Sequence, residues 1–382
     1  MKLSLPAGDG DFVSWAPSGR EPVRPEAGGF TSRAAYAAAH VVADPLTESS
    51  DGRPRVDWEA TLSFRRHLWD LGLGVAEAMD TAQRGGGVGW ETARELIRRT
   101  AAEASGPAVY GAATDQLEPG ARFGIDEIID AYGEQVSHIE DCGGDAVIMA
   151  SRHLAAVAEG PDDYLRVYGE VIGNASRRLL IHWLGPMFDP ALDGYWGTDD
   201  ASRAADTVLG IVAAHPEKVA GVKLSMLDRE LEVEMRRNLP HGVRMLTGDD
   251  LNFVDLILGD DRGHSDALLG VFDPIAPVAA AALQALDRDD VDRYRRLLGP
   301  TLPLARHLFS PPTHHYKTGV VFLAYLGGLQ DHFRMIAGAE SGRSLTHLAR
   351  LLMLADEAGL IGDPELAVHR MKPILELGGV SS

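Results

Sequence analysis

One lysine lies at the end of an apolar run of this chain, Val219-Ala220-Gly221-Val222-Lys223-Leu224-Ser225. Burial in apolar surroundings strips an ammonium of hydration, which lowers its pKa and frees the amine as a nucleophile. A free amine attacks a carbonyl carbon and gives an iminium, which serves as an electron sink when a C–C bond is made or broken. The alternative is a structural lysine paired with an acid such as Asp249.

A histidine near the end of another apolar run is a candidate for proton transfer. His182 lies in Leu180-Ile181-His182-Trp183-Leu184-Gly185-Pro186, and an imidazole titrates close to neutral pH. The alternative is a core histidine satisfied by hydrogen bonds. We expect Lys223 and His182 to act together, with Tyr110 or Tyr195 assisting the proton shuttle.

The segment after that run, Met187–Gly197, is rich in aromatic and acidic side chains. Aromatic faces stack on the C–H faces of sugars, while carboxylates accept hydrogen bonds from hydroxyls. The composition therefore favours a polyhydroxylated ligand, bound by Asp189, Tyr195 and Trp196. The alternative is a loop that packs down through Trp196 and Phe188.

A metal-dependent isomerase or epimerase is a rival interpretation of the polar residues. Histidine nitrogens and carboxylate oxygens are ligands for divalent ions, and the candidates are His40, Glu77, Glu140, His182 and His264. No His-x-x-x-His pair supports this alternative, so we expect neither a metal nor a cofactor. The segment Gly85–Gly89 lacks the spacing of a dinucleotide or P-loop fingerprint.

The elements that must position these residues alternate along the chain. Eight short apolar runs are each followed by a stretch of helical length, which indicates βαβ units and a parallel sheet. Eight such units predict an α/β fold of the closed (β/α)₈ TIM-barrel type, with an open doubly wound sheet as the alternative. The predicted strands are Ala34–Ala43, Leu73–Met79, Pro107–Ala112, Asp145–Ala150, Leu179–Leu184, Val219–Leu224, Val243–Leu246 and Ala267–Phe272.

The two ends of the chain lack this alternation. Residues 1–33 are rich in Gly and Pro and are expected to form an extended arm or a hairpin, followed by a barrel over 34–275. Residues 276–382 read as a helical appendage packed on the barrel. Its expected helices include Lys317–Met335, with the polar stretch Gln330–Phe333 inside it.

The sequence of the sixth to eighth predicted strands resembles that of a known enzyme family. Gly221-Val222-Lys223 resembles the Schiff-base strand of the dihydrodipicolinate synthase / N-acetylneuraminate lyase family of class I aldolases. Met245-Leu246-Thr247-Gly248-Asp249-Asp250 is similar to that family's seventh strand and Gly-Asp turn. The stretch from Gly263 to Pro277 resembles the eighth strand. The resemblance spans roughly residues 34–330 and implies a barrel in which Lys223 forms the iminium, in a divergent branch of that family.

Two departures from the family pattern concern the substrate. The family's strand-two turn, which holds a substrate carboxylate, matches Met79–Gly85 here, where Thr81 keeps a hydroxyl but Asp80 would repel a carboxylate. The family's strand-five tyrosine falls on Trp183 or, with a shift of one residue, on His182. The residues that we expect to bind substrate are Asp80, Thr81, Trp183, Asp189, Trp196, Gly248, Asp249 and His264.

The composition limits the classes of partner that we expect. The formal charge is −20 and the only cysteine is Cys142, which argues against a nucleic-acid or membrane partner and fits a cytoplasmic protein. We expect a homo-oligomer that acts as a lyase or aldolase on a sugar-derived carbonyl compound, either a keto-sugar or a hydroxylated 2-oxo acid. A barrel that binds a ligand without turnover is the third alternative.

Overall fold

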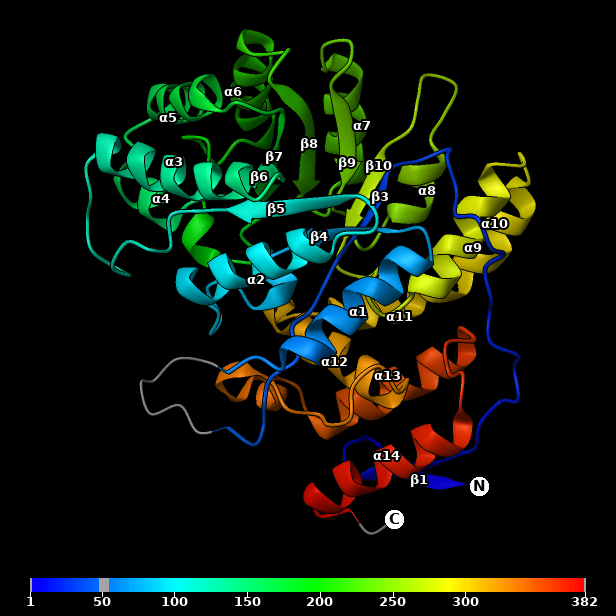
Figure 1. The fold of residues 1–382 in the computed structure, drawn as a ribbon. Helices are drawn as coiled ribbons and strands as arrows, with labels where there is room; N and C mark the ends of the chain where they lie inside the picture. Colours follow the sequence, from blue (N-terminus) through cyan, green and yellow to red (C-terminus); the bar gives the residue numbers. More distant parts are fainter. Residues whose placement is uncertain (1, 48–54, 381–382) are drawn as a thin grey trace. The chain divides into compact units, whose positions relative to one another are not determined.

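The protein is described by a computed structural model covering residues 2–47 and 55–380 (Figure 1). The chain forms two compact units. One comprises Arg33–Ala39 and Gly74–Gly270 and contains all eight strands of a barrel. The other gathers Met1–Ser32, His40–Leu73 and Val271–Ser382.

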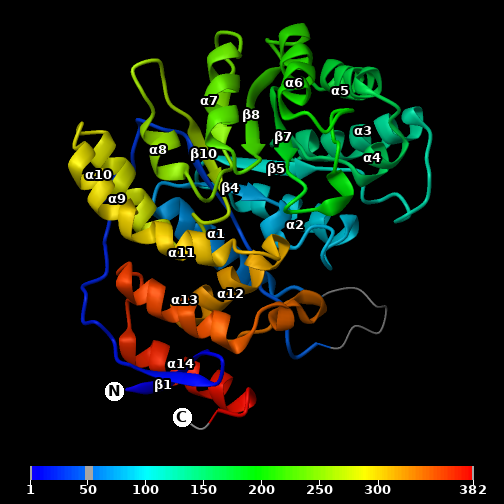
Figure 2. The same cartoon turned by 180° about the vertical axis from the view of Figure 1, so that it is seen from behind.

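The barrel is closed and every neighbouring pair of strands in it is parallel (Figures 1 and 2). All eight predicted strands are confirmed, and the (β/α)₈ prediction with them, because the sheet closes between its last and first strands. In order around the barrel the strands are β3 (Ala35–Ala38), β4 (Gly74–Glu77), β5 (Ala108–Ala112), β6 (Asp145–Ile148), β7 (Leu179–Leu184), β8 (Val219–Ser225), β9 (Arg244–Thr247) and β10 (Asp266–Leu269).

Helices follow the strands of this unit and pack on one another, as α3 does on α5 and α5 on α6 (Figure 1). Asp200 and Asp228 cap α6 and α7 by accepting hydrogen bonds from backbone N–H groups of the first turn. The helices are α2 (Trp90–Glu103), α3 (Ile125–Asp141), α4 (Arg152–Val157), α5 (Pro161–Asn174), α6 (Ala201–Ala214), α7 (Arg229–Asn238) and α8 (Phe253–Leu258), with short 3₁₀ turns η1 (Asp80–Ala82) and η2 (Pro190–Leu192).

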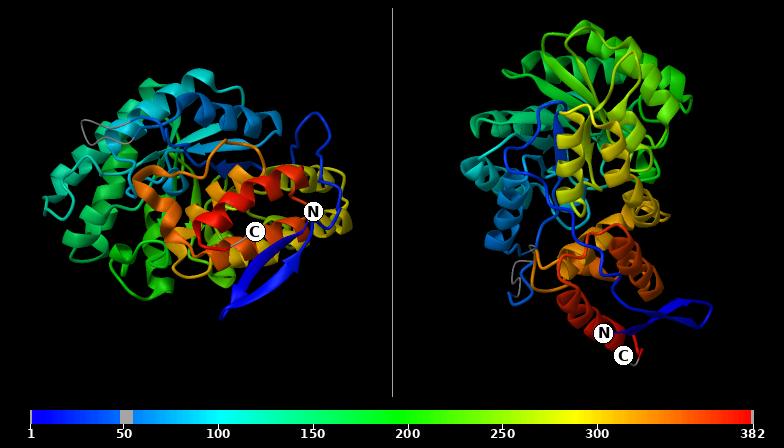
Figure 3. Two further views of the ribbon diagram at one scale, coloured as in Figure 1. Left: turned by 90° about the horizontal axis from the view of Figure 1, so that it is seen from below. Right: turned by 90° about the vertical axis from the view of Figure 1, so that its right-hand side faces the viewer.

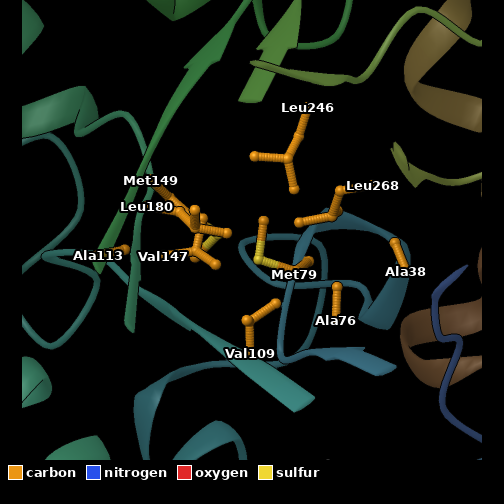
Figure 4. Close-up of a cluster of buried hydrophobic side chains, with 10 residues drawn as sticks. All are labelled: Ala38, Ala76, Met79, Val109, Ala113, Val147, Met149, Leu180, Leu246 and Leu268. Carbon is orange, nitrogen blue, oxygen red and sulfur yellow. The ribbon is translucent and has the colours of Figure 1, made fainter. Parts of the chain in front are cut away.

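Apolar side chains fill the interior of the barrel (Figure 4). Seven of the eight strands contribute a residue to this cluster, and the loops after three of them add Met79, Ala113 and Met149. The interior is therefore a packed core of the kind expected for this fold. The strand residues are Ala38, Ala76, Val109, Val147, Leu180, Leu246 and Leu268.

The other unit contains a β-hairpin and helices. The hairpin confirms one of the two forms expected for the N-terminal arm, and it packs on α13, where the indole Nε1 of Trp15 donates to Asp356 (Figure 3). Helices α11, α12 and α13 contact one another (Figure 2). The elements are β1 (Leu3–Gly8), β2 (Asp11–Trp15), α1 (Trp58–Asp70), α9 (Ala276–Leu286), α10 (Val291–Leu298), η3 (Gly299–Thr301), α11 (Leu302–Leu308), η4 (Thr313–His315), α12 (Tyr316–Leu326), η5 (Ile336–Gly342), α13 (Leu345–Glu357) and α14 (Pro364–Leu377).

One predicted helix is too long. The helix expected over Lys317–Met335 ends at Leu326, because Gly327 and Gly328 follow and Gly328 takes a left-handed backbone (φ 81°). The polar stretch Gln330–Phe333 therefore lies beyond the helix. None of the described helices is long and apolar enough to cross a membrane.

Candidate active site

The strand register turns Lys223 toward the barrel interior. Lys223 pairs with His182 on β7 and with Leu246 on β9. Registered neighbours on parallel strands face the same side of a sheet, and Leu246 belongs to the interior cluster. Leu180, two residues before His182, belongs to it as well, so Lys223 and His182 both face inward.

A glycine below Lys223 leaves room for the interior side chains. A Cβ at Gly221 would lie 2.6 Å from the carbonyl oxygen of Arg244 and 2.7 Å from Cδ1 of Leu246. Both distances are shorter than van der Waals contact. β8 can therefore contribute only a glycine to the layer of interior side chains that the other seven strands form. Lys223 is the first side chain that β8 places above this layer.

The Lys223 side chain is buried. The residue is 7% exposed, and burial lowers the pKa of its amine from 10.5 to about 8, against the opposing charges of Asp250 and Asp80. With that pKa, roughly a tenth of the amine is free at pH 7. Lys223 is therefore a desolvated amine inside the barrel.

His182 and Ser225 adjoin the lysine. His182 is 1% exposed, and its Nε2 lies 3.1 Å from the hydroxyl oxygen of Ser225. Burial, helped by the Lys223 charge, holds the pKa of the imidazole well below its usual value. In the described part of the chain, its Nδ1 is buried without a hydrogen-bond partner. The ring is therefore a neutral base with one nitrogen unused.

Position 248 has no room for a side chain, so only glycine fits there. A Cβ there would lie 2.1 Å from the hydroxyl oxygen of Ser225 and 3.0 Å from Cε of Lys223. Gly248, which we expected to bind substrate, thus makes space for the two side chains on β8. Its backbone N–H is already donated to the carbonyl of Leu224.

Two carboxylates act on the lysine. Asp250 is 4% exposed and follows β9, while Asp80 opens η1 after β4, next to the interior residue Met79. Both carboxylates favour the charged form of Lys223 and so oppose the fall of its pKa. Thr81 is buried in the same turn as Asp80.

Arg84 fastens the turn that carries Asp80 and Thr81. Its guanidinium donates two hydrogen bonds to Asp115, at 2.7 and 2.6 Å, and one to Gln135 at 2.6 Å. It also donates to the backbone carbonyls of Ala78 and Gly111. These five bonds use all five N–H groups of an arginine, so the turn is held to the loop after β5 by a saturated network.

Asp249 is engaged by the turn that precedes α8. Its Oδ1 accepts from the backbone N–H groups of Leu251 and Asn252, and its Oδ2 accepts from the Asn252 side chain. Asp249 therefore shapes the entry to α8. The acid on this turn whose charge acts on Lys223 is Asp250, and not Asp249 as the alternative supposed.

Three aromatic residues expected at the site pack against one another and against α5 rather than beside Lys223. Trp196 is fully buried and its ring packs on Trp183 and on Tyr168 of α5. The Tyr195 hydroxyl accepts from the N–H of Ser151 and contacts the hydroxyl of Tyr168. We therefore correct the prediction that Tyr195 shuttles protons and that Trp183 and Trp196 stack on substrate. The loop packs down, as the alternative stated.

Tyr110, His264 and Asp189 are not brought to the lysine either. The ring of Tyr110 covers Gly144, just before β6, and His264 precedes β10, so both lie toward the N-terminal ends of strands. Reactive groups of this fold lie at the opposite, C-terminal ends. Asp189 binds the Arg152 guanidinium at 2.5 Å and accepts from the N–H of Ala191.

The candidate metal ligands do not assemble. Glu77 accepts from Thr100 and from the N–H of Ala78, whereas Glu140 binds Ser176 and Arg177. Among the described residues no three His, Cys, Asp or Glu side chains form a group that could hold a metal ion. Two hollows on the outer helices are lined by none of the residues around Lys223.

Sequence reasoning missed Ser225 and Asp250 as site residues. Ser225 is two residues after Lys223 on the same strand and therefore on the same face, a signal that strand alternation supplies. Asp250 and Asp249 look alike in sequence. The fold distinguishes them, because Asp249 bonds the turn before α8 whereas the charge of Asp250 acts on Lys223.

The site can now be set beside known proteins. The family model described as "Protein of unknown function (DUF993)" matches residues 3–380. The chain belongs to that family. No curated protein sequence matches the DUF993 chain.

Solved structures of similar fold belong to the dihydrodipicolinate synthase family. A prophage protein of that family from E. coli K12, in complex with pyruvate, has a TM-score of 0.67 at 14% identity, over 86% of this chain and 99% of that one. The dihydrodipicolinate synthase of Aquifex aeolicus has a TM-score of 0.64 at 14% identity, over 86% and 99%. The 4-hydroxy-tetrahydrodipicolinate synthase of Methylacidiphilum fumariolicum SolV has 0.65 at 16%, over 85% and 95%. The resemblance inferred from strands six to eight is confirmed as a likeness of fold.

Proposed function

We propose that this protein is a Schiff-base-forming lyase or aldolase that acts on a hydroxylated carbonyl compound, either a keto-sugar or a hydroxylated 2-oxo acid. The observation that carries the proposal is the buried Lys223 amine, with a pKa of about 8, beside the neutral imidazole of His182. A nucleophile and a base within one desolvated site are what iminium chemistry requires.

In the proposed reaction the free Lys223 amine attacks the substrate carbonyl carbon and forms a C–N bond. The carbonyl oxygen takes up one proton from the attacking amine and one from solvent, and leaves as water, which gives the iminium. The iminium accepts the electron pair when an adjacent C–H or C–C bond breaks. When a C–H bond breaks, His182 takes the proton released from carbon. When a C–C bond breaks, it takes the hydroxyl proton of the fragment that leaves as a carbonyl compound. Ser225, at 3.1 Å, orients its ring.

The fold is compatible with this chemistry, because the similar solved structures include one with bound pyruvate, a carbonyl compound. At 14–16% identity that likeness concerns the fold, so the activity rests on the residues of this chain. The proposed groups Lys223, His182, Ser225, Asp80 and Asp250 all come from a single chain.

The proposal is tested by reductive trapping. The protein is incubated with a panel of hydroxylated carbonyl compounds and cyanoborohydride, and adducts are located by peptide mass spectrometry. The chain contains five lysines, which makes the assignment straightforward. We expect one adduct, on Lys223, that is lost in Lys223→Arg and retained in Lys218→Arg.

Lys218 is a matched control because it precedes the same strand and its Nζ binds the carbonyl of Ala175. Adducts spread over all five lysines, or equal labelling of Lys223→Arg, would reject the proposal. Ligand binding without any adduct would favour the non-catalytic barrel. Activity that is lost with a chelator and restored by a divalent ion would favour the metal-dependent isomerase.

A further inference from the structure

Two histidines face each other where α11 ends and α13 begins. His307 lies in the last turn of α11 and His347 in the first turn of α13. Their imidazole rings are stacked, with centroids 4.0 Å apart and planes inclined by 20°. Nε2 of His307 lies 3.1 Å from the backbone carbonyl oxygen of His347, to which it donates a hydrogen bond. The stacked pair therefore joins the ends of the two helices.

The geometry of this pair favours two neutral rings. An imidazolium carries a hydrogen on both ring nitrogens, and Nε2 of His347 is buried without a hydrogen-bond partner in the described ranges 2–47 and 55–380. A proton held there would be a buried donor without an acceptor, which is costly. Two imidazolium charges at stacking distance would also repel each other. Protonation thus weakens the contact between the rings.

Arg343 adds a fixed positive charge beside the pair. Its guanidinium donates to the carbonyl oxygen of Leu308, the last residue of α11, at 3.3 Å and to that of Ser310 at 2.6 Å. Burial, the neighbouring ring and this guanidinium lower the pKa of His347 to about 3. Burial is also the largest cause that lowers the pKa of His307, and Arg343 contributes to it. The charge of Arg343 therefore adds to the cost of protonating either ring.

The acids of the surrounding elements are engaged elsewhere. The elements packed on α11 and α13 are chiefly β1, η3 and α12. The acids on these five elements are Asp356 and Glu357, at the opposite end of α13 from His347. Asp356 accepts from Trp15, and Glu357 lies 3.8 Å from Arg350. The other charged or imidazole side chains on these elements and on η4 are basic: Arg306, His314, His315 and Lys317.

We propose that His307 and His347 form an acid-sensitive joint: as the pH falls, the two rings take up protons, repel each other and Arg343, and release α11 from α13. The joint lies within the unit that contains the C-terminal helices. The inference is independent of the chemistry proposed for Lys223.

Acid, and not base, opens this joint. An unfolded histidine titrates near its ordinary value of 6.5, so above that pH the rings are neutral in the folded and in the unfolded chain. Below it the unfolded chain takes up protons that the stacked pair excludes. The stability that the pair contributes is therefore present above pH 6.5 and is lost as the pH falls towards about 3.

Hydrogen exchange of the peptides from α11 and α13 tests the proposal. Exchange at about pH 7 and at about pH 5, corrected for the intrinsic rate at each pH, gives the change in the opening equilibrium constant. The full shift at His347 corresponds to a rise of about 20-fold between the two conditions. Because solvent reaches part of the ring, screening reduces this rise, and we expect it to exceed that of His347→Gln by at least about fivefold.

Two further variants make the test decisive. His307→Gln removes the other ring and should diminish the rise as well, which guards against misfolding of the first variant. His369→Gln is the matched control, because His369 is exposed on α14 of the same unit, and it should keep the rise of the parent. A rise that is equal in the parent and in both joint variants, or one that His369→Gln diminishes as much, would overturn the inference.

Discussion

Two buried histidines of this protein differ in how many partners their rings have. His40, in the unit with the C-terminal helices, is 1% exposed, and its Nδ1 lies 2.8 Å from Asp273 and its Nε2 3.1 Å from Gln330. His182, in the barrel, is equally buried, but only its Nε2 has a partner among the described residues.

The difference separates a structural role from a chemical one. The His40 ring packs on Phe64, and its carbonyl accepts from Arg65, so every polar group of the residue is engaged. A histidine fixed in this way stabilises the chain around it. A buried nitrogen without a hydrogen-bond partner lowers the stability of the folded protein. Among the described residues Nδ1 of His182 has no such partner, so a bound ligand can supply its hydrogen bond.

The largest effect on stability is expected for His40→Ala. The substitution leaves the Asp273 carboxylate buried and without the ring nitrogen that bonds it. We expect a loss of about 3–5 kcal/mol in the free energy of unfolding, measured by urea titration. A loss below about 1 kcal/mol would break the comparison, because His40 would then be no more structural than an exposed residue.

His182→Asn should show the opposite pattern. We expect its melting temperature to stay within a few degrees and its adduct with Lys223 to form at a similar rate. Deuterium exchange at the carbon next to the carbonyl should fall by about 100-fold, because the proton acceptor is gone.

Ser225→Ala provides a graded control for this prediction. It removes the hydroxyl that orients the ring and keeps the base, so exchange should fall by about tenfold. Exchange that is unchanged in His182→Asn would show that another group takes the proton.

A smaller effect is expected at Glu232 on α7, a third buried titratable group that sharpens the comparison. Its Oε1 accepts from Ser265 at 2.7 Å, yet burial raises its pKa from 4.5 to about 8. Between these two pH values the folded protein keeps a proton that the unfolded chain has released. Stability therefore falls as the pH rises from about 4.5 to about 8 and is constant above.

Glu232→Gln should remove this pH dependence. We expect the variant to equal the parent near pH 4.5 and to exceed its unfolding free energy by about 3 kcal/mol at pH 6.5. Parallel stability curves for the two proteins would contradict the raised pKa.

The fold was largely predictable because its signals are local. Each barrel strand is a short apolar run, and the helices begin at capping residues such as Asp57 and Asp200. The helix predicted over Lys317–Met335 is too long, because its apolar pattern continues beyond the Gly327-Gly328 pair that ends the helix.

The site was harder to predict, because a shift of one residue along a strand moves a side chain to the opposite face of the sheet. Spacing alone left Trp183 and His182 as alternatives, and the pairing of His182 with Lys223 decides between them. Tyr110 and Tyr195 have the right chemistry but lie against Gly144 and Ser151. No local pattern predicts those contacts, since their partners are distant in sequence.

The central claim is that one lysine amine is desolvated inside the barrel, and its titration tests that most directly. Protein labelled with ¹⁵N in its five lysine side chains is followed by NMR over pH 6–11, with Lys223→Arg as the assignment control. We predict that one signal titrates near pH 8 and that this signal is absent from the variant. A titration without any signal near pH 8, or one in which that signal persists in Lys223→Arg, would contradict the account.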